Sequence, residues 1–219
     1  MYLAFAILGA GPPATAADEE EVQRLVRRAQ DGSREAARRL YALHVSQVFR
    51  AVRPLCASEA EAEDVVQETF IRVLGGLGRY QRRDARFISW VLTIALNLAR
   101  KGLRRRSREA PLTPEDLEPG GHRGPNEDPA GEALDLRLRR RALLAALDEL
   151  PGRERQVITL RYGAGLSAAE VGELAGVSEA NVRKLCQRQR ARLLERIKAL
   201  LQPPVRREGK TSYEVTSHE

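Results

Sequence analysis

Positions 166–185 read LSAAEVGELAGVSEANVRKL, a pattern that predicts two short helices joined by a tight turn. Gly176 suits the turn because glycine adopts a left-handed backbone without strain, and the small Gly172 lets the two helices cross closely. Ser178 then stands where a helix prefers a hydroxyl group as its N-cap. The stretch therefore predicts a helix-turn-helix.

The second helix of this motif combines an apolar stripe, Val182 and Leu185, with a strongly basic surface. Between Arg183 and Lys198 the chain carries seven basic residues and one acidic residue. The side chains expected to point outward are Arg183, Lys184, Gln187, Arg188 and Arg190. This is typical of a recognition helix in the major groove of DNA, although a helical hairpin with a solvated face also fits. Because the basic run continues a capped helix, phosphate contact is the favoured interpretation.

Composition restricts the classes of protein to which the chain can belong. It has 219 residues, enough for one or two compact domains, and a net charge of +7, which fits a polyanionic partner. Cys56 and Cys186 lie far apart without a CxxC spacing, which argues against a structural zinc and a disulfide scaffold. We expect both as small helix residues that face the interior. The three histidines are scattered and pair with no evident catalytic partner.

The N-terminal segment 1–17 contains no charged side chain, so it lacks the basic start that a secretory signal requires. We interpret it as a disordered extension or the product of a misassigned start codon. No apolar run is long enough to span a membrane. Because the rest of the sequence reads as a DNA-binding protein, we expect a cytoplasmic location.

Helical spacing runs through almost all of the remaining chain and predicts an all-α protein. Apolar residues recur every three or four positions in 18–106 and again in 132–202. Between them, residues 107–131 hold five prolines and four glycines without periodicity, which predicts a linker. The polar tail 203–219 is expected to be disordered. The sequence thus predicts two small helical domains joined by a flexible linker, the second containing the helix-turn-helix.

One predicted helix is acidic although the chain as a whole is basic. Ser58 and Glu61 match a capping box at its start, and its outward side carries Asp64, Gln67 and Glu68. The helix macrodipole favours carboxylates in the first turn, but it does not account for Glu68 farther along. A surface that docks another protein is the alternative interpretation.

Basic and aromatic residues are interleaved ahead of a predicted helix that runs from about Phe87 to Arg105. Such a mixture can bind unpaired bases, because the charges follow the backbone while the rings stack on the bases. Phe87 and Trp90 fit the apolar spacing of the helix, so ordinary core packing explains both at least as well. Tyr80 and the arginines of the preceding loop are better candidates for contact.

Three motifs occur in a fixed order: AEDVVQETFIRV at 62–73, FxxWVxxIAxN at 87–97 and LPxxxRxVIxLRY at 150–162. Together with the final helix pair they resemble the extracytoplasmic-function (ECF) sigma factors of bacterial RNA polymerase, over about residues 18–200. The chain departs from this family at Ala37, where phenylalanine is usual, and at Lys101, which replaces a common acidic residue.

The resemblance implies a protein that binds core RNA polymerase, directs it to specific promoters and helps to open the DNA. Its first domain, region 2, docks on a coiled coil of the largest polymerase subunit through Asp64, Gln67 and Glu68. Region 2 also traps a flipped base of the −10 element; the matching contact positions are Tyr80, Arg82, Arg83, Arg86, Trp90, Asn97, Arg100, Arg104 and Arg105. Its second domain, region 4, reads the −35 element; the matching positions are Ser178, Ala180, Asn181, Arg183, Lys184, Gln187 and Arg188.

The implied partners are core polymerase and promoter DNA. Because family members are commonly held inactive by an anti-sigma factor, such a protein is an additional candidate partner. The polymerase does the chemistry with its own metal, so the resemblance implies no enzyme activity, no cofactor and no metal site in this chain. Two DNA-binding domains on a linker suit two separated promoter elements. Unstacking a base costs a few kcal/mol, and the contacts that trap the unstacked base offset this cost.

Two other functions fit parts of the sequence. A stand-alone helix-turn-helix regulator would bind DNA as a dimer, but it leaves the acidic helix and the basic-aromatic segment without a role. A nuclease would need clustered carboxylates for a metal, or a nucleophile with its base. The carboxylates within 59–68 are instead spread over the exposed side of a helix, with no His or Lys nearby.

Overall fold

The computed structural model describes the backbone of residues 16–81, 86–109 and 130–202, and every regular element in these ranges is a helix. The side chains of 16–18, 103–109 and 130–133 are not described. The predicted all-α class is confirmed. Outside the described residues lie most of the predicted N-terminal extension and linker, the tail, Arg82, Arg83 and the side chains of Arg104 and Arg105.

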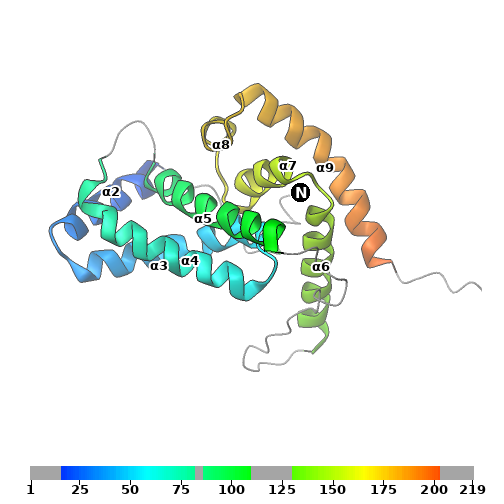
Figure 1. The fold of residues 1–219 in the computed structure, drawn as a ribbon, viewed down its shortest axis with the longest axis horizontal. Coiled ribbons are helices and arrows are strands. Elements are labelled where there is room, and N and C mark those ends of the chain that lie inside the picture. The colour runs from blue at the N-terminus through cyan, green and yellow to red at the C-terminus, as the bar shows by residue number, and fades with distance from the viewer. Residues whose placement is uncertain (1–15, 82–85, 110–129, 203–219) are drawn as a thin grey trace, which may run out of the picture.

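The first domain is a helical bundle in which consecutive helices lie against one another (Figure 1). Its elements are α2 (Ala16–Gln30), α3 (Arg34–Val52), the 3-10 turn η1 (Arg53–Leu55), α4 (Glu59–Gly76), the 3-10 turn η2 (Leu77–Arg79) and α5 (Phe87–Glu109). The α3 helix starts where Ser33 accepts a hydrogen bond from the N–H of Ala36 at 3.3 Å. The α5 helix runs past its predicted end at Arg105, since arginine is a good helix former and the next proline stands at 111.

The start of α4 differs in one detail from the predicted capping box. Ser58 accepts a hydrogen bond from the N–H of Glu61 at 3.1 Å, as expected. The carboxylate of Glu61, however, accepts from the N–H of Ala57 at 2.7 Å rather than from that of Ser58. The long glutamate side chain thus reaches one residue farther back, and the two bonds still stabilise the first turn of α4.

The second domain contains the predicted helix-turn-helix. Its elements are α6 (Ala130–Asp148), α7 (Gly152–Ile158), the π-helical turn η4 (Thr159–Gly163), α8 (Ala168–Ala175) and α9 (Glu179–Leu201). Gly176 has a φ of +65°, the left-handed conformation that the turn between α8 and α9 requires. A Cβ on Gly172 would lie 2.7 Å from the carbonyl oxygen of Val177, so only glycine allows this close approach. Both glycines therefore act as predicted.

The buried apolar side chains of the two domains form one continuous cluster. Its largest fully buried members include Leu40, Phe87, Leu92, Leu96, Leu143, Leu147, Ile158 and Leu160. The α3 helix packs on η4, and α5 packs on α8. The two predicted domains are confirmed, but they share an interface rather than lying apart. Sequence periodicity identifies the buried side of a helix without identifying what covers it.

Both cysteines face the interior, as predicted. Cys186 lies on α9, where burial raises the pKa of its thiol. Cys56 follows η1 in extended backbone rather than standing within a helix. His44 is buried on α3 with its Nδ1 3.4 Å from Oε1 of Gln47, and burial lowers its pKa. Its ring packs against that of Phe87, with 5.5 Å between the ring centroids, so His44 is part of the core of the first domain.

Candidate nucleic-acid interface

The predicted docking side chains share the outward side of α4. Phe70 on the opposite side is buried, whereas Asp64 and Gln67 are exposed and Glu68 is half-exposed. Glu68 accepts a hydrogen bond from Nε of Arg72 at 2.6 Å, one turn farther along the helix. The structure thus brings all three predicted residues to one face and adds Arg72 at its end.

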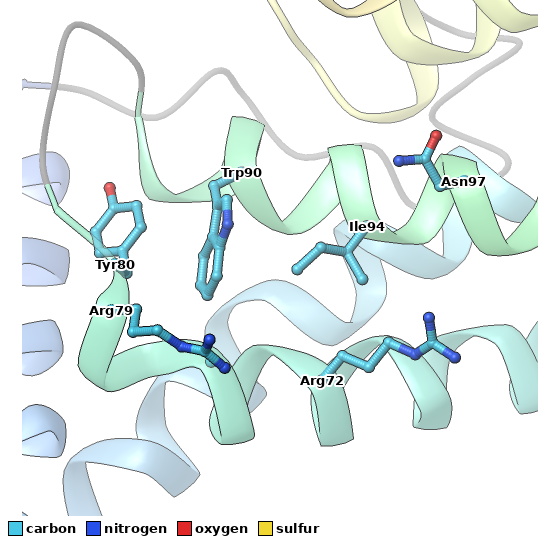
Figure 2. Close-up of a pocket in the computed structure, with 7 residues that line it drawn as sticks. Arg72, Arg79, Tyr80, Trp90, Ile94 and Asn97 are labelled. Atoms are coloured by element: carbon cyan, nitrogen blue, oxygen red, sulfur yellow. The ribbon is translucent and has the colours of Figure 1, made fainter.

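A cavity of about 420 Å³ opens at the junction of α4, η2 and α5. It is lined by Arg72, Gly76, Arg79, Tyr80, Trp90, Ile94 and Asn97. Figure 2 shows Trp90 and Ile94 reaching from α5 towards Arg72 on α4 and Arg79 on η2. An aromatic wall opposite two guanidinium groups suits an unpaired nucleotide, whose base stacks on a ring while its phosphate pairs with arginine.

Tyr80 and Trp90 supply the aromatic lining of this cavity, and Phe87 packs behind them. The ring centroid of Tyr80 lies 4.8 Å from that of Trp90 and 5.4 Å from that of Phe87. Phe87 is fully buried in the core, and Trp90 is only partly buried. Tyr80 is less accessible than predicted, with 9% of its surface exposed, because it packs against both rings. The amide of Gln30 anchors this turn by donating to the carbonyls of Leu77 and Tyr80, at 3.0 and 2.8 Å.

Two residues predicted to contact the −10 element are engaged elsewhere. Arg86 donates to both carboxylate oxygens of Glu170, from Nε at 2.5 Å and from Nη2 at 2.7 Å. Arg100 donates from Nη2 to Oε1 of Gln156 at 2.9 Å. Both acceptors belong to the second domain, so neither arginine lines the cavity. The predicted residues that do line it are Tyr80, Trp90 and Asn97.

Sequence reasoning missed Arg72, Arg79 and Ile94 as lining residues of the cavity. Arg79 lies at the edge of the basic loop that precedes α5, so its charge is the sequence signal that could have identified it. Arg72 stands one turn beyond Glu68, on the outward side of the acidic helix. Only the packing of α4 against α5 shows that this side of α4 ends at the cavity.

The α9 helix presents its basic side outward, as predicted. The exposed side chains are Ala180, Asn181, Arg183, Lys184, Gln187, Arg188 and Arg190, while Val182 and Cys186 are buried. Ser178 accepts a hydrogen bond from the N–H of Asn181 at 3.3 Å, so its hydroxyl serves as the N-cap.

Two of these arginines are paired on the protein surface. Arg183 lies 2.5 Å from Glu179, and Arg188 lies 2.9 Å from Glu154. Exposed pairs of this kind contribute little stability, so both guanidinium groups can change partners at little cost. Among the described residues, no helix is long and apolar enough to cross a membrane, and no cluster of His, Cys, Asp and Glu could hold a metal ion.

Two family models match the chain, one for each domain. The model for sigma-70 region 2 matches residues 40–109, which include the acidic face and the cavity. The model for sigma-70 region 4 matches residues 140–193, which include the helix-turn-helix. Each match therefore falls within one of the two domains that the structure describes.

The chain is also similar to known sigma factors. It is 33% identical over 186 residues to the ECF RNA polymerase sigma factor BldN of Streptomyces coelicolor, which covers 84% of this chain and 69% of BldN. The fold resembles CnrH, solved in complex with the cytosolic domain of CnrY, with a TM-score of 0.57 and 26% identity over 80% of this chain and 96% of CnrH. The sigma factor RpoE of Bartonella quintana, solved with the anti-sigma factor NepR, gives a TM-score of 0.56 and 22% identity over 74% of this chain and 96% of RpoE.

Proposed function

The chain belongs to the ECF family of RNA polymerase sigma factors, and on this premise we propose how its two domains divide promoter recognition. As a sigma factor it binds core RNA polymerase, directs the enzyme to promoters and helps to open the DNA. The observation that carries the division of labour is the pair of sites in one chain: a base-sized aromatic cavity in the first domain and a basic recognition helix in the second.

The cavity of the first domain holds one unpaired base of the −10 element. Trp90 offers the stacking surface, since part of its ring is accessible from the cavity. Arg72 and Arg79 neutralise the adjoining phosphates, and the exposed amide of Asn97 hydrogen-bonds the edge of the base. Tyr80 acts from behind by holding the indole ring in place.

The α9 helix reads the −35 element in the major groove. Ala180 and Asn181, in its first turn, face solvent together with Arg183 and Lys184. The N-terminal residues of a recognition helix are the ones that reach base edges. Gln187 and Arg188, one turn farther along, extend the contact to the DNA backbone.

The outward side of α4 docks on a basic surface of the core polymerase through Asp64, Gln67 and Glu68. Bond formation belongs to the polymerase, so the chain acts as a specificity subunit rather than an enzyme, and it works in the cytoplasm where the polymerase is. The resemblance to CnrH, which binds a cytosolic domain of another protein, supports a protein that sequesters this chain as a further partner.

Purified chain and bacterial core polymerase test this proposal in two steps. Gel filtration measures co-elution, and in vitro transcription on genomic promoter fragments measures promoter-specific initiation. We expect co-elution and discrete transcripts, which also deliver the promoter sequence. No co-elution, combined with tight DNA binding by the chain alone, would favour the stand-alone regulator.

The docking face has its own test, the charge reversal Asp64→Lys combined with Glu68→Lys. We expect weaker co-elution with core polymerase and an unchanged helical circular dichroism spectrum, because both side chains point to solvent. The matched control is Glu20→Lys, which reverses the charge of an exposed carboxylate on a different helix, α2. Equal core binding by the double variant and the control would remove the assignment.

A further inference from the structure

One acidic side chain stands at the start of a helix surface that is otherwise basic. Between Ser178 and Leu194 the only acidic residue is Glu179, the first residue of α9. Its side chain is 44% exposed, and it is not among the positions that the family resemblance assigns to DNA. A surface that meets polyanionic DNA gains affinity from lysine and arginine and loses affinity with a carboxylate. A carboxylate at this place therefore calls for a reason.

The stability of α9 gives only a partial reason. The helix macrodipole favours an acidic group in the first turn, and Nη2 of Arg183 donates to Oε1 of Glu179 at 2.5 Å, one turn farther along. Exposed pairs of this kind contribute little stability, however, and the hydroxyl of Ser178 already supplies the N-cap. Neither effect depends on the sequence of the DNA, so an experiment that measures base preference separates them from a role in recognition.

The Glu179–Arg183 pair lies beside a hollow in the surface of the second domain. Both side chains line a cavity of about 490 Å³, together with Arg161 and Arg190. Glu179 is the single acidic residue among the described residues of this lining. The hydrogen bond from Arg183 uses Oε1, and no described residue donates to Oε2. The carboxylate can therefore accept a further hydrogen bond from a ligand while Arg183 holds it in place.

The chemistry of a carboxylate selects one kind of base edge. An ionised carboxylate only accepts hydrogen bonds. In the major groove cytosine presents its N4 amino group and adenine its N6 amino group, whereas guanine O6 and thymine O4 are acceptors. A carboxylate therefore binds an amino base and repels a keto base. Cytosine is the better partner, because adenine adds the N7 acceptor beside its amino group.

We propose that Glu179 is a base-specificity residue of the recognition helix, which accepts a hydrogen bond from the amino group of one base of the −35 element, preferably cytosine. This inference rests on the proposed function. The N-terminal residues of a recognition helix reach base edges, and Glu179 is the first residue of α9. Arg183 orients the carboxylate and meets the adjoining phosphate. With a keto base at that position the carboxylate faces an acceptor, so Glu179 raises specificity and lowers total affinity.

Glu179→Gln is the variant that tests this role. Its amide has nearly the same shape but both donates and accepts, so it can bind an amino base or a keto base. The N-cap of α9 is retained, because the hydroxyl of Ser178 accepts from the N–H of Asn181. The matched control is Glu195→Gln, which removes the same charge from an exposed carboxylate of α9 that is paired with Lys198. That carboxylate lies roughly 24 Å farther along the helix axis.

The experiment uses the full chain bound to core polymerase and a promoter library in which only the −35 element is randomised. Sequencing of the bound fraction gives the base preference at each position, and fluorescence anisotropy gives the affinity for a duplex without promoter sequence. We expect Glu179→Gln to reduce discrimination between amino and keto bases on the order of tenfold, at one position only. Affinity for the non-promoter duplex should rise several-fold at low salt, and added salt should diminish the gain. Glu195→Gln should keep the wild-type base preference.

Glu179→Ala is a second variant, which removes the acceptor altogether and should lose discrimination at the same position. Unchanged base preferences in both variants would overturn the proposal. A loss spread evenly over all positions would also overturn it, because that is the result expected of a purely structural role. Selection of a −35 sequence by the wild-type chain would in either case leave the proposed function standing. If the wild-type chain with core polymerase selected no −35 sequence, the proposed reading of that element by α9 would be removed, and the inference with it.

Discussion

Replacing Gly172 by alanine tests how closely the turn of the helix-turn-helix packs on α8. The added Cβ would lie 2.7 Å from the carbonyl oxygen of Val177. That oxygen belongs to the backbone of the turn and cannot rotate away as a side chain could. The turn must therefore move, and α9, which begins directly after it, must move with it.

The size of the effect follows from two opposing contributions to the free energy of unfolding. Overpacking of this kind costs about 1–3 kcal/mol, while alanine returns up to about 1 kcal/mol through its higher helix propensity. We therefore expect a net loss of up to about 2 kcal/mol. In a chain of this size each kcal/mol shifts Tm by about 2–4 °C, so Tm should fall by up to about 8 °C.

Thermal unfolding followed by circular dichroism measures this change, and Gly75→Ala is the matched control. Gly75 lies in the last turn of α4, and a Cβ there would meet nothing within 4 Å. Alanine at position 75 should therefore gain about 0.5–1 kcal/mol from helix propensity alone. If Gly172→Ala melted at or above the wild-type temperature while Gly75→Ala gained stability, the close packing of the turn would be refuted.

Three further predictions concern the two DNA-reading sites and the core. Trp90→Ala should weaken binding of a −10 single strand by about 1–3 kcal/mol, the value of one stacked base, and Trp90→Phe should restore most of it; equal affinities in fluorescence anisotropy would exclude stacking on Trp90. Replacing Arg183 and Lys184 by alanine should lower affinity for −35 duplex DNA and reduce the slope of log K against log salt by about 2, whereas an unchanged slope would show that neither side chain meets a phosphate. Because burial lowers the pKa of His44 below its usual 6.5, the unfolded chain binds more protons in acid. Stability should therefore be complete above about pH 6.5 and decline below it by up to about 1.4 kcal/mol per pH unit, and urea midpoints of His44→Gln should lack that part of the decline.

Local rules were sufficient for the helix-turn-helix. The N-cap at Ser178 and the left-handed Gly176 each depend on atoms within a few residues, so the sequence around them specifies the geometry. The acidic face of α4 was predictable for the same reason, because residues three and four apart share one side of a helix. The predicted capping box differs only at Glu61, whose carboxylate accepts from the N–H of Ala57 instead of the neighbouring N–H of Ser58.

The cavity of the first domain could be anticipated only in part. The interleaved basic and aromatic residues indicated Tyr80, and the family resemblance added Trp90 and Asn97. It did not indicate that Arg72 lines the same cavity or that Tyr80 is buried against Trp90. Both facts depend on how α4, η2 and α5 meet, and helical periodicity carries no information about which helices meet.

From its sequence alone, this chain specifies an all-helical fold, two domains, a capped basic helix and an acidic face on α4, because helix formation and capping act over a few residues. Only the folded chain joins Arg86 to Glu170 and Arg50 to Gly163, pairs separated by 84 and 113 positions. These contacts arise from the packing of one domain on the other, where burial and close backbone approach select partners that no short-range pattern encodes. The contact between the two domains therefore belongs to the tertiary structure.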